Sequence, residues 1–132
     1  MQEVIKVVAA VVELDGKYLA CRRAASKSLP GKWEFPGGKV ELGETFEGAA
    51  IREILEELAV TIEVESFIGL SRTNQGAITI ELHAYLAKLV GSKPVGSQDH
   101  DILLWGNIEE LSKLDWAPAD IPIVALVANL SK

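Results

Sequence analysis

The stretch GKVELGETFEGAAIREILEELAV, Gly38–Val60, decides the fold of this chain of 132 residues. Its second half predicts a helix over Phe46–Leu58, because apolar residues recur there at helical spacing and Thr45 is a favourable N-cap. One side of this helix is apolar and must pack on another element, most simply a sheet. That side carries Ile51, Ile54, Leu55 and Leu58.

The opposite side of the predicted helix is acidic and carries Arg52, Glu53, Glu56 and Glu57. Glutamates three and four residues apart repel one another by about 0.2–0.5 kcal/mol per pair, and the macrodipole disfavours negative charge near a helix C-terminus. A solvated surface is one explanation, since Arg52 can relieve part of the repulsion by pairing with Glu56. A cation-binding site is the other explanation, and the surrounding residues favour it.

Two features beside the helix favour a cation site. Gly37 and Gly38 lie upstream in a flexible segment whose backbone carbonyls can approach a ligand, and Glu44 adds a carboxylate just before the helix. Oxygen ligands that converge in this way suit Mg²⁺ or Mn²⁺ better than zinc, which prefers nitrogen and sulfur. Bound cations would also turn the repulsion between the glutamates into attraction toward a common centre.

The rest of the chain alternates between strand and helix patterns. We expect strands over Val4–Val12, Lys17–Arg22, Trp33–Phe35, Ile62–Arg72, Ala77–Leu89 and Ile102–Trp105, and further helices over Ile108–Leu114 and Asp120–Leu130. The elements do not form a repeating strand–helix unit. This pattern predicts an α/β (α+β) fold with a mixed sheet and helices on both faces, in a single domain over residues 1–132.

Composition argues against several classes of protein. The formal net charge of −6 is unfavourable for coating DNA or RNA, although a divalent cation can still mediate the binding of a small nucleotide. The N-terminal apolar run is too short to span a bilayer and lacks a basic start, so we expect a cytoplasmic protein that does not contact membranes. Cys21 is the single cysteine, and its apolar neighbours indicate a buried strand position. The apolar residues leave a monomer and a homodimer equally open.

Gly38–Val60 closely resembles the Nudix box, in which a glycine, a glutamate and an Arg-Glu…Glu-Glu cluster stand at fixed spacing. The matching positions are Gly38, Glu44, Arg52, Glu53, Ile54, Glu56, Glu57 and Val60. Ala59 departs from the pattern, which has a glycine suited to a left-handed conformation after the helix. Outside the box, WEFPGGK at Trp33–Lys39 resembles the MutT branch. APADIP at Ala117–Pro122 resembles the CTP and modified-pyrimidine pyrophosphohydrolases.

The resemblance implies the Nudix fold, an α/β/α sandwich with a mixed sheet. It also implies a pyrophosphohydrolase that converts a nucleoside triphosphate into the monophosphate and pyrophosphate with Mg²⁺ or Mn²⁺. Glu53, Glu56 and Glu57 would hold the metal, assisted by the carbonyl of Gly37 or Gly38. Glu53 is also a candidate for the base that takes the proton from water.

Other matching residues are given supporting roles by the resemblance. Arg52 would orient Glu53 through a charge-assisted hydrogen bond, and Glu44 would either support the metal ligands indirectly or bind the metal as an additional ligand. Lys39 and Arg23 are candidates for contacts with phosphate, although Arg23 is equally well explained as a surface arginine. We expect His83 to be a structural histidine, because nothing nearby completes a ligand set.

A further acid often lies in the late loop of such enzymes, and the resemblance implies that it contributes to the metal site. Asp99 occupies the matching position in the sequence Gln98-Asp99-His100-Asp101, and Asp101 is the alternative. Most acids in loops are solvated, so this assignment rests on the resemblance and on the general role of loops in function.

Asp120 is the residue that bears on the base of the nucleotide. One explanation makes it the N-cap of the last helix. The other makes it a reader of the base edge, where an ionised carboxylate would accept from the exocyclic amine of cytosine or adenine. MutT proteins that act on 8-oxoguanine nucleotides have asparagine here, so aspartate favours a cytosine-type substrate over 8-oxo-dGTP. Phe35 could wall the base or pack in the core.

Two alternatives to triphosphate hydrolysis are open. One is hydrolysis of another nucleoside diphosphate derivative, such as ADP-ribose or a dinucleotide. The other is a Nudix-like module that binds a nucleotide without catalysis. Retention of all three glutamates, Glu53, Glu56 and Glu57, argues against the second alternative.

Overall fold

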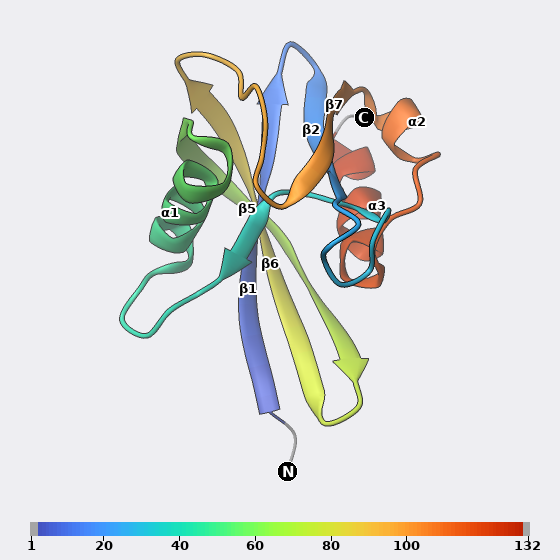
Figure 1. Cartoon of the computed structure of the whole chain (residues 1–132). Helices are drawn as coiled ribbons and strands as arrows, with labels where there is room; N and C mark the ends of the chain where they lie inside the picture. The colour runs from blue at the N-terminus through green and yellow to red at the C-terminus, as the bar shows by residue number, and fades with distance from the viewer. Residues whose placement is uncertain (1–2, 131–132) are drawn as a thin grey trace.

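The computed structural model describes residues 3–130, so the first two and last two residues of the predicted domain lie outside the described residues. Strands and helices are arranged as in Figure 1. In chain order they are β1 (Glu3–Leu14), β2 (Lys17–Arg23), β3 (Trp33–Glu34), β4 (Gly37–Lys39), α1 (Phe46–Leu58), β5 (Thr61–Gln75), β6 (Ile78–Val90), β7 (His100–Gly106), α2 (Ile108–Leu111), the 3₁₀ helix η1 (Pro118–Asp120) and α3 (Ile121–Leu130).

The strands form one mixed sheet, as the sequence predicts. Its order is β3-β2-β1-β6-β5, with β4 paired to β1 and β7 paired to β2. The pairing of β1 with β6 is parallel, from Glu3 opposite Ile78 to Glu13 opposite Lys88, and the other pairings are antiparallel. A parallel pair at the centre requires cover on both faces, which the helices provide.

Helices cover the two faces of the sheet: α1 lies on one face, and α2 and α3 lie on the other (Figure 1). Residues of β1 alternate between the two cores. Val8, Ala10 and Val12 pack toward α1, whereas Ala9 and Val11 pack toward α3. This α/β/α arrangement confirms the predicted fold class. Among residues 3–130, no helix combines the length and the apolar character needed to cross a bilayer.

Helix α1 has the predicted bounds, and both of its ends are capped. The Thr45 hydroxyl accepts a hydrogen bond from the Gly48 N–H at 3.0 Å. At the other end Ala59 adopts a left-handed conformation with φ of 56° and donates to the Leu55 carbonyl at 3.0 Å. An L-residue in this conformation costs about 1–2 kcal/mol, and here the tertiary structure outweighs that cost. The helix therefore ends where the Nudix pattern has glycine, without needing one.

The predicted apolar side of α1 is wrong in part. Ile51 and Leu55 are 38% and 53% exposed, whereas Ala49 and Ala50 are fully buried beside Ile54 and Leu58. Small alanine side chains let the helix approach the sheet closely, so the stripe Ala50-Ile54-Leu58 faces it. This rotation has a consequence for the acidic side: Glu57 turns inward, and only 8% of its side chain is exposed.

Several segments differ from their predicted ends. The segment Gly37–Lys39, expected as loop, pairs with β1 as β4. Strand β7 begins at His100, two residues before its predicted start, and α2 ends at Leu111. Asp120 belongs to η1 rather than to the last helix. Cys21 is fully buried in β2, as predicted.

Candidate active site

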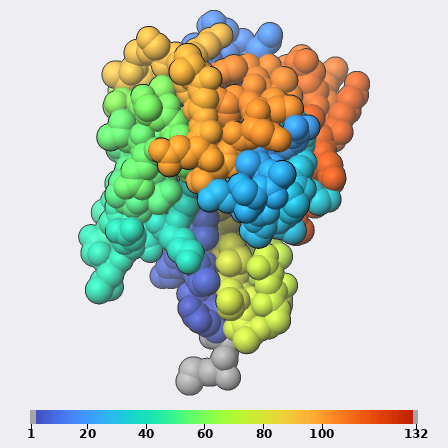
Figure 2. Space-filling model, viewed as in Figure 1, coloured from blue at the N-terminus to red at the C-terminus, as the bar shows by residue number. Residues whose placement is uncertain are grey.

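A cleft of about 380 Å³ opens on one face of the molecule, a size typical of small-molecule sites. The loop formed by residues 24–32 and the segment that leads into β7 meet at this face (Figure 2). Many predicted site residues line the cleft: Arg23, Phe35, Gly37, Gly38, Lys39, Glu57, Asp99 and Asp120. The other predicted residues, Glu44, Arg52, Glu53 and Glu56, stand beside it on α1 and the segment before α1.

Arg52 is the centre of the charge network on α1. Its Nε atom donates to Glu44 at 2.7 Å, and its Nη1 atom donates to Glu53 at 2.8 Å and to Glu56 at 3.1 Å. Its Nη2 atom donates to the Lys39 carbonyl at 3.0 Å. The guanidinium fork thus joins β4, the segment before α1 and the helix itself. The predicted contact between Arg52 and Glu53 is present.

Glu44 is bound on both sides. Its carboxylate accepts two hydrogen bonds from Arg52 and one from the backbone N–H of Glu41. The bonds from Arg52, then the bond from Glu41, lower the pKa of Glu44 to about 2. A carboxylate held in this way keeps its charge and position. Its contacts fit the supporting role better than proton transfer.

Gly37 and Gly38 are required by close approach. A Cβ atom on Gly37 would collide with the Val8 carbonyl of β1, and a Cβ atom on Gly38 would collide with the carboxylate of Glu53. Glycine at both positions therefore lets the sheet, β4 and α1 converge. The Glu53 side chain lies directly against the backbone of Gly38.

Glu57 is a buried acid whose charge is poorly compensated. Its carboxylate accepts a backbone hydrogen bond from Gly37 and lies 3.5 Å from Nδ1 of His100 through Oε1, whereas Oε2 is buried with no hydrogen-bond partner among residues 3–130. Burial is the main reason that the pKa of Glu57 rises from 4.5 to about 8, and the Gly37 bond opposes the rise. The negative charges that add to this rise belong to Glu34, Asp99 and Glu53.

The residues present fit a divalent cation by their chemistry. The buried Oε2 of Glu57 is a carboxyl oxygen without a hydrogen-bond partner among residues 3–130, and the missing Cβ of Gly38 leaves its backbone open beside Glu53. The carboxylates are not yet gathered around one point, because Arg52 holds Glu53 and Glu56. Within residues 3–130, no three His, Cys, Asp or Glu side chains are arranged as a ready metal-binding set.

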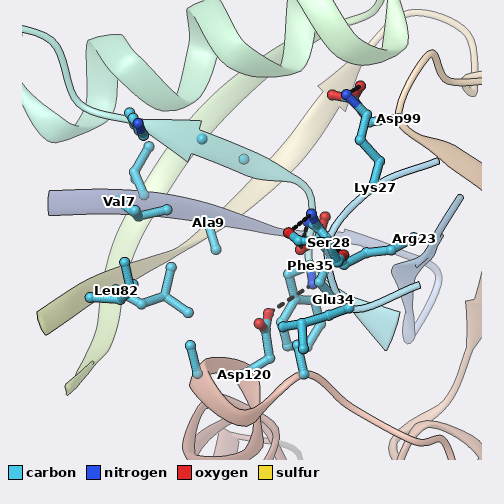
Figure 3. Close-up of a pocket in the computed structure, with 18 of the residues that line it drawn as sticks. Val7, Ala9, Arg23, Lys27, Ser28, Glu34, Phe35, Leu82, Asp99 and Asp120 are labelled. Atoms are coloured by element: carbon cyan, nitrogen blue, oxygen red, sulfur yellow. Dashed lines mark hydrogen bonds and ion pairs between the residues drawn. The ribbon is translucent and has the colours of Figure 1, made fainter. Parts of the chain in front are cut away.

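Asp99 and Asp101, the two late-loop candidates, lie in different surroundings. Asp99 lines the cleft and pairs with Lys27 of loop 24–32 at 2.8 Å (Figure 3). Asp101 is instead bound by Arg22 through two bonds of 2.9 Å, at an exposed position outside the lining residues. Of the two acids, Asp99 is therefore the one that can face a ligand.

At the other end of the cleft, Asp120 is 5% exposed and accepts a hydrogen bond from the Phe35 N–H at 3.0 Å (Figure 3). This bond replaces the N-capping role considered from the sequence. Burial is the main reason that the pKa of Asp120 rises to about 8. Phe35 packs on Trp116 in the core, with ring centroids 4.7 Å apart, and it also lines the cleft. The apolar wall nearby is formed by Val7, Ala9, Ile80 and Leu82.

Arg23 is an organising residue rather than a free surface arginine. Its Nη1 atom donates to Glu34 at 3.0 Å, and its other donors bind the carbonyl and the hydroxyl of Ser28. These bonds fix loop 24–32 against β3. With three of its five N–H donors engaged, Arg23 shapes the cleft through this loop. Lys39 is exposed and reaches the rim of the cleft.

Sequence reasoning missed several polar residues of the site. Glu34 stands inside the segment WEFPGGK, yet only its neighbours were singled out. Lys27 looks like an ordinary loop lysine until its ion pair with Asp99 is known. His100 is adjacent to Asp99 and was given no role, although it is 6% exposed and bonded to Glu34 at 2.7 Å. Its position beside a candidate acid was the signal available in the sequence.

Comparisons with known proteins place the chain in a family. The family model described as NUDIX domain matches residues 4–127. The chain is 37% identical to the CTP pyrophosphohydrolase of Escherichia coli, over 92% of this chain and 90% of that protein. It is 33% identical to the 8-oxo-dGTP diphosphatase of the same organism, over 83% of this chain and 84% of that protein. The solution structure of the E. coli ORF135 protein superposes with a TM-score of 0.85 at 35% identity, covering 98% of this chain and 91% of that chain.

Proposed function

The chain belongs to the Nudix family of hydrolases, and from this premise we propose that it is a cation-dependent pyrophosphohydrolase of nucleoside triphosphates. The reaction adds water across a phosphoanhydride bond and yields the nucleoside monophosphate and pyrophosphate. A role in removing unwanted nucleotides from the cellular pool is consistent with this activity. Similarity to relatives named for CTP and for 8-oxo-dGTP supports the class of substrate.

One observation carries the proposal: Glu57 is buried in the cleft, and one of its oxygens has no hydrogen-bond partner in the described part of the chain. Burying a carboxyl oxygen without a partner costs free energy of folding, so such a group calls for a ligand that satisfies it. A cation that belongs to the working enzyme would supply the missing positive charge. The same cleft extends to Asp120 and an apolar wall, which suits a ligand with phosphates at one end and a base at the other.

Glu53, Glu56 and Glu57 would hold Mg²⁺ or Mn²⁺, with the carbonyl of Gly37 or Gly38 as a further ligand. When bound, the cation neutralises the phosphate chain and makes water a better nucleophile. In this scheme Glu53 and Asp99 are the two carboxylates that can accept the proton of the attacking water.

The other side chains orient these groups. Arg52 fixes Glu53 from one side while its contact with Glu44 keeps the guanidinium in place. Lys27 is the cation nearest to Asp99, and Lys39 stands at the rim, so both are suited to meet phosphate oxygens. Arg23 keeps loop 24–32 folded beside them.

Asp120 is the residue proposed to bind the base, as a protonated carboxyl group and not as a carboxylate. With a pKa of about 8, this carboxyl keeps its proton at neutral pH and can donate one hydrogen bond as well as accept. The sequence argument for cytosine assumed an ionised group that only accepts. A neutral Asp120 is compatible with cytosine and with 8-oxoguanine, so both CTP and 8-oxo-dGTP are proposed as substrates.

A panel of CTP, dCTP, 8-oxo-dGTP and ADP-ribose, each with Mg²⁺ or Mn²⁺, tests the proposal by the release of pyrophosphate and monophosphate. We expect pyrophosphate from at least one triphosphate. Glu53→Gln should lower kcat by about a hundredfold or more, in the range found when a proton-transferring group is removed. Hydrolysis of ADP-ribose alone would favour the diphosphate alternative. Nucleotide binding without hydrolysis of any compound would favour the non-catalytic module.

A further inference from the structure

His100 is a buried polar residue for which the proposed function gives no role. Its side chain is completely shielded from solvent at the start of β7. It is neither part of the Nudix box nor one of the residues that line the cleft. A polar ring in such a place must have its hydrogen-bonding groups satisfied from within the protein.

A bulge in the pairing of β7 with β2 sets the direction of this ring. Arg22 lies opposite Ile102 and Arg23 lies opposite His100, so Asp101 is an extra residue between the two pairs. Bulges change the direction of side chains and are common beside active sites. Here Asp101 points outward to Arg22, while His100 stays inside the protein.

The imidazole connects three separate segments. Its Nε2 atom lies 2.7 Å from Oε2 of Glu34 on β3. Its Nδ1 atom lies 2.8 Å from the Ser97 hydroxyl and 3.5 Å from Oε1 of Glu57 on α1. Because Nε2 faces an acceptor, it carries the hydrogen of the neutral ring, and Nδ1 accepts a hydrogen bond from the Ser97 hydroxyl. The approach of Nδ1 to Glu57 is therefore a packing contact and not a hydrogen bond. The contact with Glu57 is made on the Oε1 side, and Oε2 is the oxygen left without a partner.

We propose that His100 is a positioning residue of the active site: the Nδ1 side of its ring, held by Ser97, packs against the metal ligand Glu57, and its Nε2 atom binds Glu34. The Nδ1 side of the ring lies against Oε1 of Glu57 and so limits the positions open to this carboxylate. The Nε2 arm holds Glu34, and Glu34 in turn binds Arg23, the residue that folds loop 24–32. The ring therefore connects the metal ligand Glu57 with loop 24–32. This inference rests on the proposed function for the role of Glu57.

Two conservative substitutions of His100 separate the contacts made by Nδ1 from the contact made by Nε2. Asparagine places a polar atom near the position of Nδ1, and glutamine places one near the position of Nε2. Binding of Mn²⁺ without nucleotide is measured by the loss of the EPR signal of free Mn²⁺. We expect His100→Leu and His100→Gln to weaken Mn²⁺ binding about tenfold or more, as for other residues that orient metal ligands, and His100→Asn to stay within about threefold of the native protein.

The kinetics of CTP hydrolysis measure the effect of the bond between Nε2 and Glu34 on substrate binding. We expect His100→Asn to raise KM for CTP with a smaller change in kcat, and His100→Gln to restore KM toward the native value. Equal losses in both variants, for both Mn²⁺ affinity and KM, would reduce His100 to a packing residue and overturn the inference. A folded His100→Leu variant that binds Mn²⁺ as the native protein does would also overturn it. If His100→Leu does not fold, the asparagine and glutamine pair decides.

The matched control is His83→Gln. His83 also pairs with a glutamate at 2.8 Å, Glu81, and its ring stacks on Phe46, yet it does not line the cleft. We expect this variant to bind Mn²⁺ with native affinity. If the native protein binds Mn²⁺ but hydrolyses no CTP, the choice of substrate fails and the Mn²⁺ comparison still tests His100. Absence of Mn²⁺ binding by the native protein would overturn both proposals.

Discussion

Replacing Glu57 by glutamine should stabilise the metal-free protein at high pH. The folded protein raises the pKa of this carboxyl from 4.5 to about 8, mainly by burial. A raised pKa means that the folded state holds the proton more tightly than the unfolded chain does. The stability from this group is therefore complete below pH 4.5 and is lost progressively as the pH rises toward 8. Glutamine has no proton to lose, so the variant escapes this loss.

The size of the effect follows from the interval between the two pKa values. At pH 7 the unfolded chain has lost its proton while folded Glu57 largely retains it, a span of about 2.5 pH units from the ordinary value of 4.5. At about 1.4 kcal/mol per unit, the penalty is on the order of 3 kcal/mol. The difference in unfolding free energy between Glu57→Gln and the native protein should grow by about this amount from pH 4.5 to pH 7.

Urea denaturation in EDTA, followed by tryptophan fluorescence across this pH range, measures the difference. Glu56→Gln is the matched control, because its side chain is on the same helix and 60% exposed. Its stability curve should run parallel to that of the native protein. Adding Mn²⁺ should restore stability to the native protein more than to Glu57→Gln, because a ligand of the cation is missing in the variant. Parallel pH curves for Glu57→Gln and the native protein would refute the account of Glu57 as an uncompensated buried acid.

Three further results are expected. Gly38→Ala should destabilise the protein by about 1–3 kcal/mol and weaken Mn²⁺ binding, because the new methyl group would collide with Glu53. The control in both measurements is Gly96→Ala, because a Cβ at that position meets no atom within 4 Å. Arg52→Lys should lower the unfolding free energy measured in urea by about 1.5–3 kcal/mol, because lysine lacks the guanidinium fork that binds several acceptors. An unchanged urea concentration at the midpoint of unfolding would contradict the role of Arg52 as the centre of the network. Cys21 should resist a thiol reagent at pH 8 until the protein is unfolded, because burial raises the pKa of its thiol; rapid labelling of the native protein would contradict this.

Helix α1 was predictable because its determinants are local. Capping by Thr45 and the spacing of apolar residues fix its ends without reference to distant parts of the chain. The side that it buries was less predictable. That choice depends on how closely Ala49 and Ala50 approach the sheet, which hydrophobicity alone does not reveal, because Ile51 and Leu55 are more hydrophobic yet remain exposed.

The same distinction applies to the site. Arg52, Glu44 and Glu53 meet within one short segment, so their contacts could be inferred from spacing and from the family resemblance. Glu34 and His100 are 66 positions apart and meet only because β3 and β7 both pair with β2. Spacing carries no trace of such a contact. The protonation of Asp120 was unpredictable for a similar reason, since it follows from burial by the whole fold.

The extra residue in β7 divides the late part of the chain into a segment that tolerates changes of length and one that does not. Upstream, residues 91–96 form an open connection, and a residue added there is absorbed before Ser97. Removing Asp101 would instead eliminate the bulge, leave His100 in regular pairing with Arg23, and change the local twist that directs the His100 ring. A variant with a grafted or lengthened loop should therefore keep residues 97–102 unchanged. The order of residues in this segment determines where the side chains of Ser97, Asp99 and His100 point.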